Sequence, residues 1–77
     1  MSVGVAQIRA ARGLIGWSQT DLAEAAIVSR ATIADFEAGK RIPYARTIKL
    51  LQRALESAGV EFIPENGGGA GVRLRKP

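Results

Sequence analysis

Residues 17–40, WSQTDLAEAAIVSRATIADFEAGK, decide the fold, because they read as two short helices joined by a tight turn. Ser18 is a favourable N-cap, and Asp21 three residues later completes an acidic form of the capping box. The first of the two helices is therefore expected to begin at Gln19. Its inward face consists of small and apolar residues at helical spacing, namely Leu22, Ala23 and Ala26.

The second helix repeats the same start signal. Ser29 is its expected N-cap, Ile33 and Phe36 turn inward, and Ile27 is a further inward candidate. Gly39 is expected to end this helix in a left-handed conformation. Only residues 26–28 then remain for the turn. Two helices this short cannot bury both apolar faces by themselves, so the rest of the chain should complete their core.

This stretch resembles the helix-turn-helix of the Cro/cI-type (XRE-like) DNA-binding domains found in phage repressors and bacterial regulators. The matching positions are Gln19, Ala23, Ser29, Ile33, Phe36, Glu37, Gly39 and Lys40. The resemblance continues upstream through IRAARGLIGWSQ and downstream through GKRIPYARTIKLLQRALESAGV, and so covers roughly residues 5–60. It implies a mainly α fold, a compact four-helix lambda-repressor-like domain with a short C-terminal β element.

One position departs from the family pattern. Ile27 stands where the family most often has a glycine in the turn. A β-branched residue at positive φ costs on the order of 1–2 kcal/mol. The turn is therefore either strained or avoids the left-handed region.

Composition narrows the functional class. The 77 residues suit a single small domain, divided here into a DNA-binding part, 1–60, and a strand-forming tail, 61–77. The absence of cysteine and histidine argues against disulfides, the usual metal sites, cofactors and most acid–base catalysis, so no enzyme is expected. A formal charge of +4 favours a polyanionic partner. With no signal peptide or membrane-length apolar run in the sequence, the expected location is cytoplasmic.

Two further helices should flank the motif. Residues 2–15 have an apolar face of Val5, Ile8, Ala11 and Ile15, with Gln7, Arg9 and Arg12 on other faces. Residues 45–58 place Ile48, Leu51, Ala54 and Leu55 inward and Lys49, Gln52, Arg53 and Glu56 outward. The resemblance implies an ion pair between Arg12 and Glu37 that ties the first helix to the third; the alternative is a solvated arginine.

The resemblance also assigns the DNA contacts. The residues that read bases are expected to be Arg30, Ala31, Thr32 and Asp35, near the start of the second motif helix. Arg30 suits bidentate binding to guanine, Thr32 can touch a thymine methyl or donate a hydrogen bond, and Ala31 can offer only apolar contact. Asp35 could accept from cytosine, repel wrong sites or orient Arg30. The expected DNA-backbone contacts are Gln19, Ser29, Lys40 and Arg41, although Lys40 could equally complement the helix dipole.

The tail has the pattern of strands. Residues 60–64 and 71–75 are strand candidates, joined by the flexible connection ENGGGAG. An isolated two-stranded ribbon is marginal in water, so we expect a dimerisation element, made by Phe62, Ile63, Val72 and Leu74. The competing interpretation is a disordered basic tail in which Arg73, Arg75 and Lys76 attract DNA without sequence preference.

The sequence therefore predicts a sequence-specific transcription regulator that binds double-stranded DNA as a homodimer on a palindromic operator, and repression by occlusion of the promoter. A restriction-modification controller is a variant of this hypothesis. An alternative from another class is an antitoxin-like module that binds a protein partner through its C-terminal tail while the helix-turn-helix binds DNA.

Overall fold

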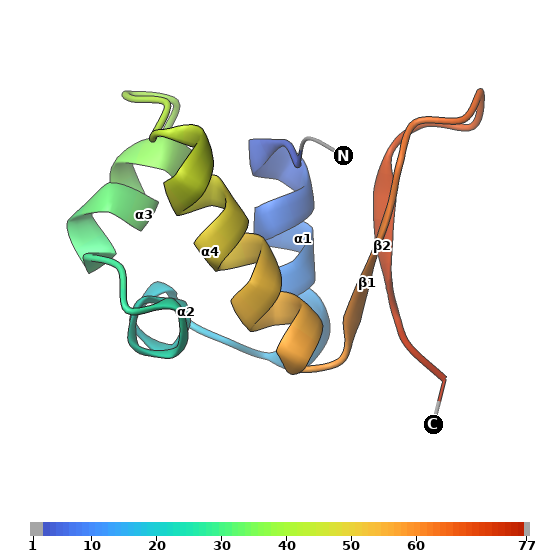
Figure 1. Cartoon of the computed structure of the whole chain (residues 1–77), viewed down its shortest axis with the longest axis horizontal. Helices are drawn as coiled ribbons and strands as arrows, with labels where there is room; N and C mark the ends of the chain where they lie inside the picture. Colours follow the sequence, from blue (N-terminus) through green and yellow to red (C-terminus); the bar gives the residue numbers. More distant parts are fainter. Residues whose placement is uncertain (1–2, 77) are drawn as a thin grey trace.

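The structure is a computed structural model that describes residues 3–76. Four helices are followed by a β-hairpin: α1 (Val5–Ile15), α2 (Gln19–Ala26), α3 (Arg30–Glu37), α4 (Ala45–Ser57), β1 (Val60–Ile63) and β2 (Gly71–Leu74). The predicted fold class, a mainly α helix-turn-helix domain with a short C-terminal β element, is confirmed. In Figure 1, α3 lies at one end of the molecule and the hairpin at the other, with α4 and α1 between them.

Local capping defines both helices of the motif. The Ser18 hydroxyl accepts a hydrogen bond from the Asp21 amide (3.0 Å), and the Asp21 carboxylate accepts one from the Ser18 amide (2.9 Å). The Ser29 hydroxyl likewise accepts from the Thr32 amide (3.2 Å). Because each serine satisfies a donor that the helix itself cannot pair, α2 and α3 begin at the residues that follow.

The turn between α2 and α3 adopts the strained alternative. Ile27 has φ 56° and ψ 50°, and it is the single non-glycine residue with positive φ among residues 3–76. Its side chain is 90% exposed, so the expectation that it turns inward is wrong. The left-handed backbone directs this side chain into solvent, where it gains no packing to offset the strain.

The first helix is shorter than predicted. It begins at Val5 with Gly4 as its N-cap, and the predicted start at Ser2 lies outside the described residues. Gly4 is extended, and its amide donates to the Gln7 side chain (3.0 Å). Gly16, with φ 68°, ends the helix in the left-handed conformation.

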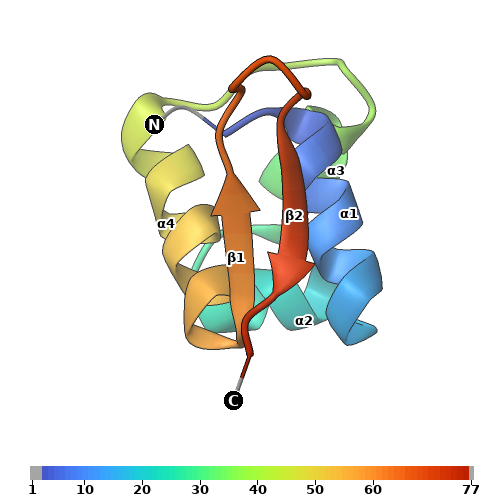
Figure 2. The same ribbon diagram turned by 90° about the vertical axis from the view of Figure 1, so that its right-hand side faces the viewer.

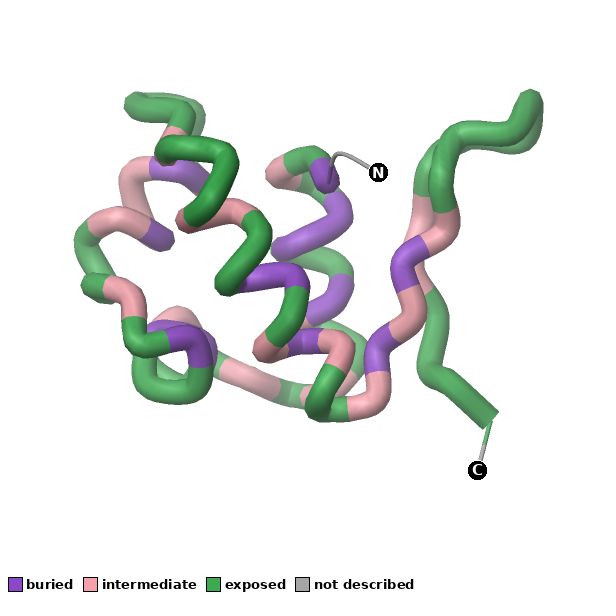
Figure 3. The backbone as a smooth tube through the Cα atoms, viewed as in Figure 1, coloured by how far each residue is buried: buried purple, intermediate pink, exposed green. Residues whose placement is uncertain are grey.

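The core joins all four helices to the hairpin. Its fully buried side chains come from every layer of the fold: Ile8, Leu22, Ile33, Leu51, Leu55 and Val60. Figure 3 shows buried segments of α1, α4 and the hairpin facing one another. Phe62 belongs to the same apolar cluster, and Val72 packs against it. The hairpin therefore covers the helices of its own chain instead of standing as an isolated ribbon.

Two glutamines that the sequence places on outer faces are buried. Gln7 is 8% exposed because its amide clamps the hairpin onto α1, donating to the carbonyls of Ile63 (3.3 Å) and Gly71 (3.0 Å). Gln52 is 7% exposed and donates to the Glu56 carboxylate (3.1 Å). Both are tolerated in the interior because their polar atoms have partners.

Candidate nucleic-acid interface

Three of the expected base-reading residues lie in the first turn of α3, and Asp35 follows one turn later. Arg30 and Ala31 are exposed, whereas Thr32 and Asp35 are half-buried. Ser29 precedes them as the N-cap, and it is exposed at the positive end of the helix. This end of α3 is remote from the hairpin (Figure 1), so α3 is free to enter a groove.

A bidentate ion pair holds the far end of α3. Arg12 donates from Nε to Glu37 Oε2 (2.8 Å) and from Nη2 to Glu37 Oε1 (2.6 Å). Its Nη1 also donates to the Trp17 carbonyl (2.9 Å), in the segment between α1 and α2. The side chain of Glu37 is only 6% exposed and that of Arg12 19%. One guanidinium therefore ties α1, the start of the motif and α3 together.

The ion pair remains charged at neutral pH. Burial raises the pKa of Glu37, but the hydrogen bonds from Arg12 and Gln19 outweigh burial, and the net pKa lies below its ordinary value. The hydrogen bond to Glu37 raises the pKa of Arg12 further above neutrality. Glu37 is consequently an ionised carboxylate that can only accept hydrogen bonds.

Gln19 connects this ion pair to the reading end of α3. Its Nε2 donates to Glu37 Oε1 (3.1 Å), and its Oε1 accepts from Arg30 Nη1 (3.4 Å). Since the ionised Glu37 accepts only, the amide of Gln19 must present its NH₂ group to Glu37 and its oxygen to Arg30. The contacts form one chain, Arg12 to Glu37 to Gln19 to Arg30, that biases the position of the arginine most suited to reading guanine.

Lys40 and Arg41, which are expected to contact the DNA backbone, lie in the loop after α3, and both are exposed. Gly39, with φ 76°, reverses the chain there, and the Lys40 amide donates back to the Asp35 carbonyl (2.9 Å). This closure returns the basic loop alongside α3, and a hollow lined by Thr32 and Arg41 marks the junction.

Two apolar residues of this loop were missed by the sequence reasoning. Ile42 is 84% exposed and Tyr44 76% exposed, and they flank Pro43. The guanidinium of Arg46 lies 5.4 Å from the centre of the Tyr44 ring, in the range of a cation–π contact. Two apolar residues beside a proline in a basic loop were a signal that could have identified this surface, because neighbouring exposed apolar side chains that form a patch mark interaction sites.

The residues expected to form a dimer interface are for the most part covered by their own chain. Phe62 is 6% exposed within the core of its own chain, and Val72 and Ile63 are half-buried. Leu74 is 53% exposed. Phe62 is thus unavailable to a second copy, since the sheet face that carries it already packs on α1 and α4.

The family model for the helix-turn-helix matches residues 8–62. The chain therefore belongs to the helix-turn-helix family of Cro/cI type and is a DNA-binding regulator. No curated protein matches the chain.

Two other structural findings concern metals and membranes. Within residues 3–76, no three carboxylate, histidine or cysteine side chains lie close enough together to hold a metal ion. No helix of the same described segment is long and apolar enough to cross a membrane.

Proposed function

We propose that the protein is a sequence-specific transcriptional repressor that binds a palindromic operator as a homodimer. The chain of contacts from Arg12 to Arg30 carries this proposal, because a reading side chain held in advance loses less conformational freedom on binding. Repression requires nothing beyond occupancy of a promoter, which a domain of this size can provide.

Each residue of the candidate interface has a role in this proposal. Arg30 reads a guanine, Thr32 and Ala31 contact a thymine methyl, and Asp35 rejects sites whose phosphates or bases present a negative edge to it. Gln19 and Ser29 bind phosphate at the start of their helices, and Lys40 and Arg41 bind phosphate from the loop.

Dimerisation on such an operator favours a surface near α3. Two recognition helices must reach major grooves about 34 Å apart on one side of the duplex. The hairpin is at the end of the molecule opposite α3 (Figure 1), so pairing of two hairpins would direct the two recognition helices away from each other. The exposed Ile42 and Tyr44 lie next to α3 and suit this contact better than the hairpin residues assigned from sequence.

Two substitutions test the division between reading and anchoring residues. Arg30→Ala should relax the preference at one base pair, at a cost of about 1–3 kcal/mol on the preferred site. Lys40→Ala should weaken binding to all sequences equally and reduce the slope of log affinity against log salt by about one unit. The affinity of both variants, measured on matched and mismatched duplexes at several salt concentrations, distinguishes a reading residue from an anchoring residue. Identical behaviour of the two variants would overturn the division.

The antitoxin-like alternative supposes a flexible tail that wraps a partner. Residues 60–63 and 71–74 form an ordered hairpin instead. A protein partner would therefore meet a sheet with defined edges.

A further inference from the structure

The hairpin leaves the outer edge of β2 open. Glu61 is the register partner of Arg73, and the Arg75 amide donates to the Gly59 carbonyl (2.8 Å). In an antiparallel pair, the main-chain groups of alternate residues point toward the partner strand, so those of Arg73 and Arg75 point toward β1. The main-chain groups of Val72 and Leu74 then point outward. Within residues 3–76, no hydrogen bond outside the sheet engages them.

A surface for an added strand lies beneath this edge. Figure 2 shows α1 extending behind β2 and past its open edge. Gln7 faces the hairpin, and Ala10 and Leu14 follow on the same side of α1 at helical spacing, both of them exposed. Leu14 is 41% exposed and Leu74 53% exposed. A third strand would cover these apolar groups as well as pair with the edge.

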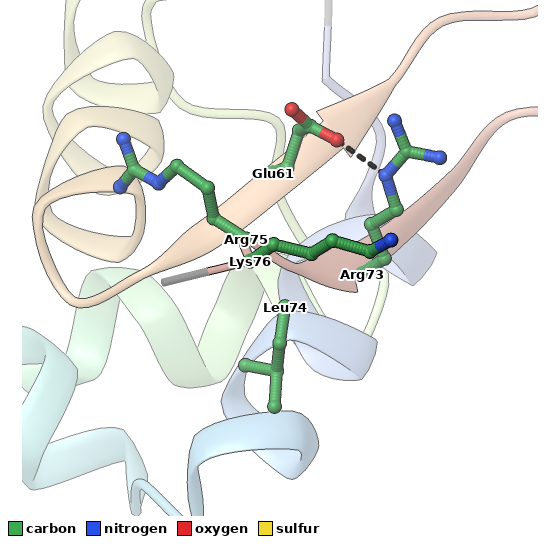
Figure 4. Close-up of a pocket in the computed structure, with 5 residues that line it drawn as sticks. All are labelled: Glu61, Arg73, Leu74, Arg75 and Lys76. Atoms are coloured by element: carbon green, nitrogen blue, oxygen red, sulfur yellow. Dashed lines mark hydrogen bonds and ion pairs between the residues drawn. The ribbon is translucent and has the colours of Figure 1, made fainter.

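The charge around the edge is strongly basic. Arg73, Arg75 and Lys76 are all exposed on β2 and just beyond it, whereas the neighbouring strand contributes only Glu61, which pairs with Arg73 (Figure 4). The Arg75 guanidinium donates to the Glu56 carbonyl at the end of α4, so its charge is directed across β1 and away from the open edge, which leaves Arg73 and Lys76 as the cations nearest that edge (Figure 4). Operator DNA bound by α3 cannot neutralise these charges, because α3 is at the other end of the molecule (Figure 1).

We propose that the open edge of β2 binds an extended acidic segment of a partner protein as a third strand. The segment would place acidic side chains beside Arg73 and Lys76 and apolar side chains over Leu14 and Leu74, since successive residues of a strand alternate between faces. A second copy of this chain suits the edge less well. In the twofold registers centred on Arg73 or Leu74, an arginine lies directly opposite an arginine, which destabilises pairing.

The test titrates the isotopically labelled protein with a short synthetic peptide of alternating valine and glutamate, followed by amide NMR. Saturable shifts at Val72, Leu74 and the exposed side of α1 are expected. A peptide of alternating valine and lysine should not bind. A proline-interrupted peptide with the same glutamates controls for simple charge attraction, and equal binding of it would overturn the proposal.

Variants separate the main-chain contacts from the charges. Leu74→Pro removes an outward-facing amide that the hairpin does not use, and should weaken peptide binding by roughly tenfold, whereas Leu74→Ala keeps the amide and should weaken it by no more than about threefold. Arg73→Gln with Lys76→Gln should weaken binding by about three- to tenfold, and the matched change Arg53→Gln on α4 should not.

Two further results would overturn the proposal. One is peptide binding that survives both Leu74→Pro and the double change at the basic residues of the edge. The other is self-association of the protein alone that Leu74→Pro abolishes. The second would assign the edge to a copy of the chain. Because this test contains no DNA, its outcome is independent of the proposed repressor function.

Discussion

Replacing Ile27 with glycine should stabilise the protein. Ile27 is held at φ 56° by the tight turn between α2 and α3, and its side chain is 90% exposed. Glycine adopts this conformation without a steric penalty, because it has no Cβ to approach the following carbonyl. The substitution therefore removes strain and gives up almost no buried apolar surface.

The magnitude follows from two opposing terms. Relief of left-handed strain at a β-branched residue contributes about 1–2 kcal/mol. The greater flexibility of glycine in the unfolded chain costs about 0.5–1 kcal/mol. The net expectation is about 0.5–1 kcal/mol of added stability, which corresponds to a rise in Tm of roughly 2–8 °C for a domain of this size.

Chemical and thermal unfolding of three proteins provides the test. Ile27→Gly should unfold at higher denaturant concentration than the wild type with an unchanged m-value, whereas Ile27→Ala keeps a Cβ at positive φ and should gain less. If the glycine variant were no more stable than the alanine variant, strain at this turn would not be the cause, and the reasoning from φ would be refuted.

Two other predictions concern buried polar groups. Glu37→Gln should lower the free energy of unfolding at pH 7 by about 2–4 kcal/mol, because it leaves the partly buried Arg12 without its counter-charge. Folding lowers the pKa of Glu37 from its ordinary 4.5, so the stability that its ionised carboxylate contributes is present above that pH and is lost as the pH falls through the pKa of the folded state. The free energy of unfolding, measured from pH 7 to pH 3, should therefore decline less steeply in Glu37→Gln than in the wild type. Parallel curves for the two proteins would contradict this. Gln7→Ala should reduce the hydrogen-exchange protection of the hairpin amides by about 1–3 kcal/mol, because the carbonyls of Ile63 and Gly71 lose their donor, and the amides of α4 should lose less. Equal loss of protection in the hairpin and in α4 would mean that Gln7 does not stabilise the hairpin locally.

Local signals were sufficient to predict the helices. Ser18 and Ser29 are caps whose partners lie three residues away, so both helix starts could be read directly from the sequence. The same is true of Gly39, whose left-handed conformation after α3 was predicted from its place in the sequence. Such signals depend only on neighbours in the chain, which is why the fold class and the motif were predictable.

Contacts between distant segments were not predictable in the same way. Gln7 reads as a surface residue of an amphipathic helix, and its burial depends on carbonyls 56 and 64 residues further along the chain. Phe62 reads as part of an exposed strand, because the sequence does not show that the hairpin folds back onto α1 and α4. The left-handed conformation of Ile27 follows from the tight turn and opposes the preference of isoleucine itself.

In the candidate site, too, one contact was predictable from the sequence and another was not. Arg12 and Glu37 were paired through the family resemblance, and they are joined by two hydrogen bonds in the structure. The link from Glu37 through Gln19 to Arg30 could not be predicted from the sequence, because it depends on the orientation of the Gln19 side-chain amide in the folded protein.

The central claim is that the protein recognises a palindromic DNA sequence as a dimer. Selection of bound sequences from a random duplex pool, with the pure protein at physiological salt, tests it most directly. We expect an enriched palindrome whose half-sites are about 10 bp apart, the spacing of successive major grooves on one side of the duplex. Absence of any enriched motif with folded protein, or a single half-site without a repeat, would contradict it.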